Sequence, residues 1–215
     1  MSESKKILVT GGAGYIGTTL VPLLLKRGHE VTVYDNMTVD GSGLIHNFGE
    51  PNFKFIKGDI LEVNELKKAV EGQDIVIHLA AVVGYAACRR DEDMAYAINH
   101  QGTKNVISCM DGSQFLVYGS TGSNYGAVED VCTEETPLNP LSIYGTSKTL
   151  GEQEVMKYPN STAFRFATAF GVSPRLRLDL LVNDLSYLAH TQKYIVIYES
   201  HFMRTFIHVR DIARV

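Results

Sequence analysis

KKILVTGGAGYIG, residues 5–17, is the stretch that decides the fold of this chain. An apolar run at residues 7–9 reaches Thr10, glycines follow at positions 11, 12, 14 and 17, and apolar side chains then recur at helical spacing over residues 15–25. This order predicts a strand, a glycine turn and a helix, the arrangement in which proteins hold a dinucleotide pyrophosphate. Glycine lets the backbone approach the phosphates, and the helix N-terminus offers free N–H groups to the anion. The alternative is a tight turn that binds no ligand.

The composition is that of an ordinary globular protein. The chain has 215 residues, of which 45 % are hydrophobic and 20 % charged, so one domain with a substantial core is expected. A net charge of -4 leaves no basic footprint for nucleic acid. No apolar run approaches the roughly 20 residues of a membrane span, and the first residues (MSESKK) do not resemble a signal peptide. We therefore expect a cytoplasmic protein without nucleic-acid or membrane partners.

The cysteines do not form a recognisable pattern. Cys88, Cys109 and Cys132 are an odd number, widely spaced and without a CxxC pair. We expect reduced thiols and neither a disulfide framework nor a metal site.

Strand-like and helix-like segments alternate along the whole chain. Strands are expected at residues 5–10, 30–34, 53–56, 74–79, 115–118, 162–167 and 194–198. Helices are expected at residues 15–27, 62–71, 91–110, from about 142 onward, and 178–189. The alternation predicts an α/β fold with a doubly wound parallel sheet, the Rossmann fold.

Asp35 ends the second expected strand, 18 residues after Gly17. This is near the spacing of the carboxylate that accepts hydrogen bonds from the adenosine ribose of a dinucleotide. A carboxylate there would repel the extra phosphate of NADP, so NAD is favoured. The alternative is that Asp35 only shapes the turn after its strand.

Tyr144 and Lys148 lie four residues apart near the start of an expected helix, so they share one helix face. A nearby ammonium group lowers the pKa of a phenol, which would make Tyr144 a proton donor and acceptor for alcohol–ketone interconversion. Thr121, after a preceding strand, could hydrogen-bond the same substrate oxygen. By itself a YxxxK pair is a weak signal, because most such pairs lie on helix surfaces.

Taken together, these motifs resemble the extended short-chain dehydrogenase/reductase family, in particular its nucleotide-sugar epimerase/dehydratase branch. The matching segments span nearly the whole chain in family order: TGGAGYIG (10–17), YDN (34–36), GDI (58–60), HLAA (78–81), NHQGTKNV (99–106), YGSTGSNYG (118–126), TPLNPLSIYGTSK (136–148) and RTFIHVRD (204–211).

The resemblance implies a set of cofactor-binding residues for NAD. The pyrophosphate would be held by Gly11, Gly14, Tyr15, Ile16 and Gly17. The adenosine would be held by Asp35 and Asn36 at the ribose and by Asp59 and Ile60 beside the adenine. The path of the cofactor would be lined by Leu79, Ala80 and Ala81. The nicotinamide end would be met by Asn99, Tyr144 and Lys148.

The resemblance also implies catalytic and substrate-binding roles. Tyr144 would be the acid/base, Lys148 would tune it, Thr121 would be its hydroxyl partner and Asn99 would support the site. Substrate contacts would come from Thr121, Thr168, Asn183 and Arg204, although Asn183 and Arg204 could simply be exposed polar residues. Ser120 either takes part in the site or is a strand-end hydroxyl whose hydrogen bond is made to the backbone. Arg175 and Arg177 are phosphate ligands or part of a solvated turn.

The segment after Thr121 bears on the reaction. Family members that eliminate water across C4 and C6 carry an Asp-Glu pair there, whereas this chain has Gly122-Ser123. We therefore expect an NAD-dependent oxidoreductase that acts on a nucleotide-diphosphate sugar by Tyr-assisted hydride transfer, as a C4 epimerase. The alternatives are a nucleotide-sugar dehydrogenase/reductase or dehydratase, and a non-catalytic NAD-binding protein.

The resemblance further predicts how the chain is organised. Residues 1–170 would form the NAD-binding Rossmann domain, and residues 171–215 would begin a substrate-covering region that is largely absent. Full-length relatives continue for roughly a hundred further residues, enough for most of a small domain. The helices near 91–110 and 143–157 resemble the family's dimer-forming pair, so a homodimer is expected.

Overall fold

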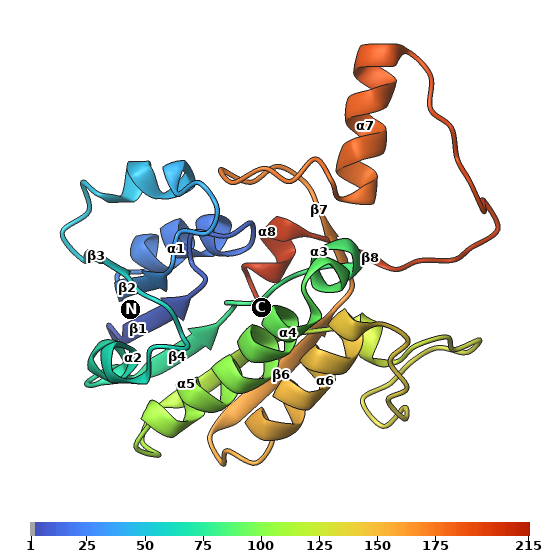
Figure 1. Cartoon of the computed structure of the whole chain (residues 1–215). Helices are drawn as coiled ribbons and strands as arrows, with labels where there is room; N and C mark the ends of the chain where they lie inside the picture. Colours follow the sequence, from blue (N-terminus) through green and yellow to red (C-terminus); the bar gives the residue numbers. More distant parts are fainter. Residues whose placement is uncertain (1–2) are drawn as a thin grey trace.

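The computed structural model describes residues 3–215 and contains a six-stranded parallel sheet (Figure 1). Its strands are β1 (Lys6–Thr10), β2 (Glu30–Asp35), β3 (Phe53–Lys57), β4 (Ile75–His78), β5 (Phe115–Thr121) and β6 (Ser161–Phe166). They lie in the order β3-β2-β1-β4-β5-β6, and every neighbouring pair is parallel. The predicted doubly wound sheet is confirmed.

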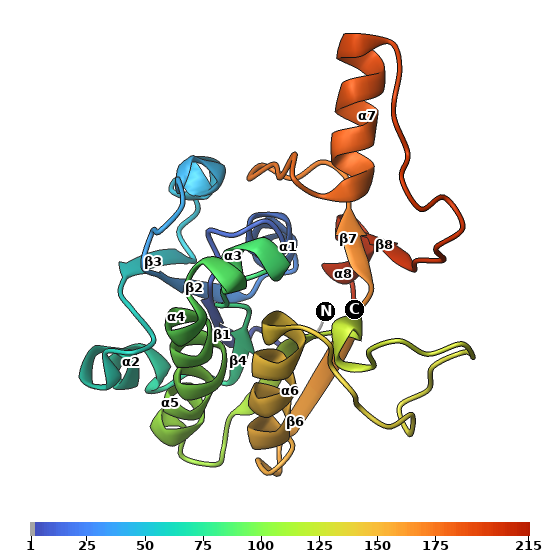
Figure 2. The ribbon, with the colours of Figure 1, turned by 45° about the vertical axis from the view of Figure 1, so that its right-hand side comes forward.

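Helices cover both faces of this sheet (Figure 2). The α-helices are α1 (Gly17–Lys26), α2 (Val63–Val70), α3 (Tyr85–Arg90), α4 (Glu92–Tyr96), α5 (Thr103–Cys109), α6 (Ile143–Val155), α7 (Leu181–Gln192) and α8 (Val209–Ile212). One face packs against α1 and the 3₁₀ helix η1 (Ser42–Asn47), and the other against α2, α5 and α6.

The central strand β1 shows why the sheet is built this way. Ile7 and Val9 belong to the apolar cluster under α1, while Leu8 belongs to the cluster under α2, α5 and α6. All three are at most 2 % exposed. Successive strand side chains point to opposite faces, so a continuous apolar run is stable only where both faces are covered. Burying each of these side chains contributes about 1.5–3 kcal/mol.

The strand expected at 194–198 is wrong. The stretch is irregular, and its apolar side chains are exposed, Tyr198 by 84 %. Its β-branched and aromatic residues favour an extended chain, but strand propensity needs a neighbouring strand to pair with, and none of the described residues provides one.

Other elements differ in extent or were not predicted. The helix expected at 178–189 begins at Leu181, and the helix expected at 91–110 consists of α4, a π-helical segment η2 (Ala97–Gly102) and α5. Helix α3 was not predicted, nor was the small parallel sheet of β7 (Thr168–Phe170) and β8 (Phe206–His208).

Helix α7 and the irregular stretch after it project away from the main sheet (Figures 1 and 2). None of the α7 residues is buried. Within residues 3–215, no helix has both the length and the apolar character needed to cross a bilayer.

Candidate cofactor and active site

The carboxyl ends of β1, β2, β4 and β5 gather most of the predicted site residues at one edge of the sheet. The strand order reverses between β1 and β4, and in open α/β sheets ligands bind in the crevice beside that reversal. The glycine turn follows β1, and the segment from Leu79 to Ala81 follows β4. The structure therefore places the two predicted cofactor-binding segments at the expected position.

Glycine is required in the turn after β1. Gly11 has a φ of 70°, and a Cβ on it would lie 2.5 Å from the backbone nitrogen of Ala80. A Cβ on Gly17, the first residue of α1, would lie 2.4 Å from the carbonyl oxygen of Gly12. A side chain at position 11 would push the turn away from the segment after β4, and one at position 17 would push the start of α1 away from the turn.

The turn leaves backbone donors free at the start of α1. Within residues 3–215, the N–H groups of Tyr15 and Ile16 have no acceptor. Free N–H groups at a helix N-terminus, with the partial positive charge of the helix, suit the phosphate oxygens of a dinucleotide. This is one observation by which the residues present fit NAD.

Asp35 holds the glycine turn in place. Its carboxylate, which is 8 % exposed, accepts hydrogen bonds from the N–H groups of Ala13 (3.0 Å) and Met37 (2.9 Å). Asp35 thus does shape the turn after its strand, and a carboxylate also keeps acceptor capacity for hydroxyl groups. Both alternatives from the sequence are compatible with this geometry.

Two of the four residues predicted at the adenosine, Asn36 and Asp59, are joined to each other. The Asn36 amide donates to the Asp59 carboxylate (3.0 Å), which also accepts from the N–H of Leu61 (2.9 Å). Ile60 is buried, and its carbonyl accepts a hydrogen bond from Asn105 (3.0 Å). The ends of β2 and β3 are therefore braced at the predicted adenosine side of the crevice.

Asn99 lies in the π-helical segment η2 and is fully buried. Its side-chain oxygen accepts from the N–H of Val82 (2.8 Å), and its amide donates to the Val82 carbonyl (2.9 Å) and the Ser147 hydroxyl (3.0 Å). Both amide protons are used on the protein. Asn99 therefore braces the segment after β4 against α6, one residue before Lys148.

Thr121, Tyr144 and Lys148 converge where β5 ends and α6 begins. The Ser142 hydroxyl caps α6 by accepting from the N–H of Gly145 (3.0 Å), so the helix starts just before Tyr144. Thr121 ends β5, near enough to Tyr144 for its hydroxyl to lower the pKa of the phenol. Lys148 follows one helical turn later. The structure brings the three predicted catalytic side chains together.

The predicted lowering of the Tyr144 pKa is wrong for this structure. Burial raises the pKa of the Tyr144 phenol, and the smaller effects of Thr121 and the Arg177 charge oppose that rise. The Lys148 ammonium does not offset this rise; its Nζ lies 3.9 Å from the centre of the neighbouring Tyr118 ring. Tyr144 is therefore a phenol at neutral pH in this state.

Lys148 is a buried cation without an ordinary partner. It is 2 % exposed, and among residues 3–215 its side chain forms no hydrogen bond or salt bridge. Burial lowers the pKa of Lys148 from 10.5 to about 7, although the Glu152 carboxylate partly opposes this. An unpartnered buried ammonium is suited to hydroxyl acceptors such as those of a ribose. This is a second observation by which the chain fits NAD.

The predicted substrate residues are placed less tightly. Thr168 begins β7, and Arg204 is exposed and forms no hydrogen bond or ion pair with the described residues. The Asn183 side chain is used on the protein: it accepts from the N–H of Gly171 (2.8 Å) and donates to the carbonyl of Arg177 (2.9 Å). Asn183 therefore secures the segment after β7.

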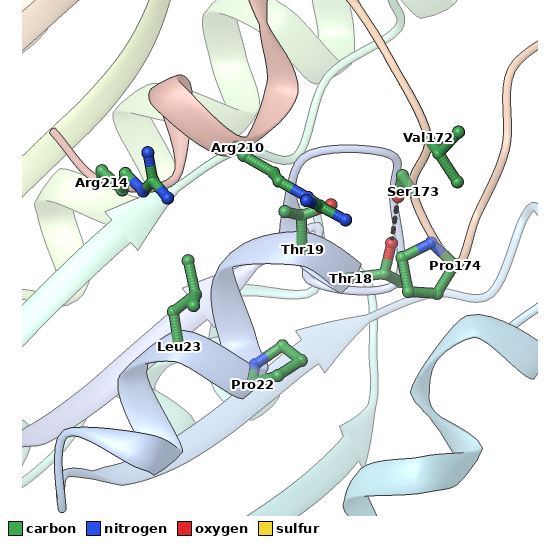
Figure 3. A pocket seen from close by; sticks show the side chains of 9 residues that line it. All are labelled: Thr18, Thr19, Pro22, Leu23, Val172, Ser173, Pro174, Arg210 and Arg214. Atoms are coloured by element: carbon green, nitrogen blue, oxygen red, sulfur yellow. Dashed lines mark hydrogen bonds between the residues drawn. The ribbon is translucent and has the colours of Figure 1, made fainter.

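The segment after β7 is fastened to the start of α1. The hydroxyl oxygens of Thr18 and Ser173 lie 2.9 Å apart (Figure 3). Ser173 also donates to the carbonyl of Tyr15 (2.7 Å). Arg210 and Arg214 line the other side of a cavity of about 460 Å³ beside this contact (Figure 3). None of the predicted site residues lines this cavity.

His78 is a buried residue that the sequence analysis did not single out. The Thr103 hydroxyl donates to the Asn99 carbonyl (2.8 Å), so it accepts from Nε2–H of His78 (3.1 Å). Nδ1 then accepts from the Thr10 hydroxyl (2.7 Å). Burial lowers the pKa of His78 to about 3, so the ring is neutral. His78 thereby joins the end of β1 to the segment that carries Asn99.

Residues 7–215 match the model of the NAD dependent epimerase/dehydratase family, and this chain belongs to that family. The family confirms the predicted resemblance and the predicted cofactor, NAD. The family match also supports the prediction that the chain belongs to an NAD-dependent enzyme.

Known proteins similar to this chain include a protein described as an uncharacterized UDP-glucose epimerase from Bacillus subtilis (strain 168). It is 33 % identical over 225 residues, which cover 97 % of this chain and 70 % of that protein. A mutant UDP-glucuronic acid 4-epimerase from Bacillus cereus was solved with UDP-4-deoxy-4-fluoro-glucuronic acid and NAD. It has a TM-score of 0.87 at 28 % identity, covering 97 % of this chain and 71 % of that one.

A third similarity concerns the fold alone. The UDP-N-acetylglucosamine 4-epimerase from Methanobrevibacter ruminantium M1, in complex with UDP-N-acetylmuramic acid, has a TM-score of 0.90 at 23 % identity. The match covers 99 % of this chain and 72 % of that one.

Proposed function

We propose that this chain is the cofactor-binding and catalytic part of an NAD-dependent oxidoreductase that epimerises a nucleoside-diphosphate sugar at a ring hydroxyl, C4 in the first instance. One observation carries the proposal. Thr121 at the end of β5, Tyr144 at the start of α6 and the unpartnered Lys148 one helical turn later lie at the carboxyl edge of the sheet. The epimerases among the similar proteins support the choice of reaction.

The cofactor would be held along the crevice by the residues predicted from the sequence. The turn from Gly11 to Gly17 would take the pyrophosphate, and Asp35 with Asn36 the adenosine ribose. Lys148 would take the nicotinamide ribose. The chemistry supplied by bound NAD is the reversible acceptance of a hydride from the oxidised sugar carbon.

Tyr144 and Thr121 would handle the proton. In the oxidation half, the Tyr144 phenolate accepts the proton of the sugar hydroxyl while Thr121 donates a hydrogen bond to the same oxygen. In the return half, Tyr144 gives that proton back to the ketone oxygen, after the ketone has turned its other face. One proton and one hydride leave and return, so no further reactant is consumed. Since burial raises the pKa of Tyr144, the phenolate needs a positive charge close to it, and Lys148 is the candidate on the same helix face.

The structure after β5 argues against dehydration. Residues Gly122–Asn124 form a short 3₁₀ helix, and the Thr121 hydroxyl accepts from the N–H of Ser123 (3.2 Å). Elimination of water needs an acid and a base beside the sugar, and this segment supplies no carboxylate. A dehydrogenase or reductase of the same sugars would use the same three side chains.

We further propose roles for the remaining residues of the predicted site. Thr168, Asn183 and Arg204 would meet the substrate once its nucleotide end is bound. Residues 1–170 would act as the NAD-binding domain, and residues 171–215 as the beginning of the substrate-binding region. The homodimer and the cytoplasmic location stay predictions.

The test is a panel of nucleotide sugars incubated with the chain and NAD, with the products separated by chromatography. Turnover of one sugar that Tyr144→Phe abolishes, and that the exposed control Tyr187→Phe leaves unchanged, supports the proposal. Turnover that survives in Tyr144→Phe contradicts it. NAD binding without any substrate-dependent change in nicotinamide absorbance would instead favour the non-catalytic alternative.

A further inference from the structure

Glu152 lies on the same face of α6 as the predicted catalytic pair. It follows Lys148 by four residues, as Lys148 follows Tyr144, so the three side chains are stacked one turn apart. Glu152 is 4 % exposed. A carboxylate is seldom buried so deeply unless its charge and its acceptor sites are satisfied.

The four hydrogen bonds of Glu152 join α6 to three other segments. Oε2 accepts from the Ser120 hydroxyl (2.5 Å) and from the Asn124 amide (2.9 Å). Oε1 accepts from Nε (2.9 Å) and Nη2 (2.7 Å) of Arg165. Ser120 precedes Thr121 in β5, Asn124 belongs to the 3₁₀ helix η3 (Gly122–Asn124), and Arg165 belongs to β6. The Ser120 hydroxyl is therefore bound by a side chain and not by backbone.

Arg165 extends this network beyond the helix. Its Nη1 donates to the Tyr125 hydroxyl (3.1 Å) and to the Glu134 carbonyl (3.1 Å), and its guanidinium lies 5.1 Å from the centre of the Tyr125 ring. The two Arg165 donors that reach Glu152 share one carboxylate oxygen, Oε1, and such charge-assisted hydrogen bonds are stronger than neutral ones. These side chains therefore fix the distance between β5, which ends in Thr121, and α6, which carries Tyr144. Neither Glu152 nor Arg165 was among the predicted cofactor-binding or substrate-binding residues.

Glu152 also contributes charge to the site. Lys148 interacts electrostatically with three ionisable groups: Cys88 from α3, His78 from β4 and Glu152 from α6. The Tyr118 ring of β5 also lies against the ammonium group. Of these, Glu152 is the carboxylate, and it raises the pKa of Lys148 against the effect of burial. Tyr144, on the same face, is the remaining titratable neighbour on α6.

We propose that Glu152 is a positioning residue for the reaction: through Ser120, Asn124 and Arg165 it fixes the end of β5 against α6, the helix that carries Tyr144 and Lys148. This proposal rests on the proposed function for its kinetic part. The geometry of a proton transfer between Thr121, Tyr144 and a substrate oxygen tolerates little displacement, so a contact that fixes both elements acts on the rate.

Glu152→Gln tests the proposal with little change of shape. The new amide would face the Asn124 amide, donor against donor, and the negative charge would be lost. We expect kcat to fall by about 100-fold while KM for the nucleotide sugar changes little. The midpoint of the Lys148 titration, followed by NMR with ¹³Cε-labelled lysine and assigned with Lys148→Met, should move about one pH unit lower. Glu154→Gln, the same change at a half-buried position of α6 that pairs with Lys157, is the matched control.

A second variant separates positioning from a loss of folding. In Asn124→Asp/Glu152→Gln the new amide can donate to the new carboxylate, which restores both the hydrogen bond and the charge. Recovery of kcat and of the Lys148 midpoint in this double variant supports the proposal. If Glu152→Gln alone does not fold, the double variant must fold with a midpoint like that of the original chain; a lower midpoint would overturn the charge role.

The experiments distinguish a failure of the Glu152 role from a failure of the proposed function. A kcat of Glu152→Gln within about twofold of the original, or an unchanged Lys148 midpoint, would overturn the positioning role even where the sugar reaction is established. If no nucleotide sugar is turned over by the original chain, the proposed function fails. The Lys148 titration then decides the role of Glu152 without reference to activity.

Discussion

Replacing Lys148 by methionine should remove activity and at the same time stabilise the fold. Lys148 is buried, carries no hydrogen-bond partner among residues 3–215, and has a pKa of about 7 where an unfolded lysine has 10.5. That difference corresponds to about 5 kcal/mol of folding free energy lost at and below neutral pH. Methionine keeps the volume without the charge but gives up the contact with the Tyr118 ring, so the net gain should be about 1–4 kcal/mol.

The pH dependence identifies the source of this gain. Between pH 7 and pH 10.5 the unfolded chain binds a proton at Lys148 that the folded chain has released, so stability should rise with pH across this window. Lys148→Met lacks this rise. Urea unfolding followed by far-ultraviolet circular dichroism at pH 7.0 and pH 9.5, without cofactor, measures both effects. Lys157→Met, an exposed lysine near the end of the same helix, should change stability by less than about 0.5 kcal/mol.

Two results would refute the reasoning. The first is a Lys148→Met variant less stable than the original chain at pH 7. The second is an equal rise in stability between the two pH values in both proteins, since the rise would then come from other groups. Loss of substrate turnover in the variant, together with its greater stability, would show that the site retains a destabilising group for its function.

Further predictions concern the cofactor crevice and the groups beneath it. His78 has a pKa of about 3 in the folded chain and 6.5 in the unfolded chain, so between these pH values only the unfolded chain binds the proton. Lowering the pH from 7.5 to 5 should therefore reduce the free energy of unfolding, measured with urea, by about 2 kcal/mol. The His78→Gln variant should not show this reduction. By calorimetry NAD should bind at least about tenfold more tightly than NADP, and Asp35→Asn should narrow that ratio; equal affinities for the original chain would contradict the role of the carboxylate. Gly17→Ala places a methyl group 2.4 Å from the Gly12 carbonyl and should destabilise the chain by about 1–3 kcal/mol with loss of NAD binding, whereas Gly49→Ala, with open space around it, should be neutral.

Much of the fold could be predicted because its signals are local. The apolar run of β1 is buried on both sides, and the glycines after it are required by contacts of a few ångströms with Ala80 and Gly12. Helix α6 begins at its Ser142 cap. The strand expected at 194–198 failed for the opposite reason. Its residues favour an extended chain, but pairing is decided by segments distant in sequence.

The site shows the same division. The residues of the glycine turn, Asp35, Tyr144 and Lys148 could be named from spacing. Glu152 and His78 could not, because a single carboxylate on a helix or a single histidine ending a strand carries no pattern. Only their buried partners, Arg165 and Ser120 for the first and Thr10 and Thr103 for the second, distinguish them.

From the sequence alone came the class of fold, the glycine turn predicted to hold NAD and the Tyr144–Lys148 pair proposed for proton transfer, because each depends on residues close together in the chain. Only the tertiary structure decided the ionisation of that pair. Burial raises the pKa of Tyr144. Burial lowers the pKa of Lys148, and the Glu152 carboxylate partly reverses that lowering. These shifts depend on how much water and which charges surround each group, and both are fixed by packing between segments that the sequence does not place beside one another.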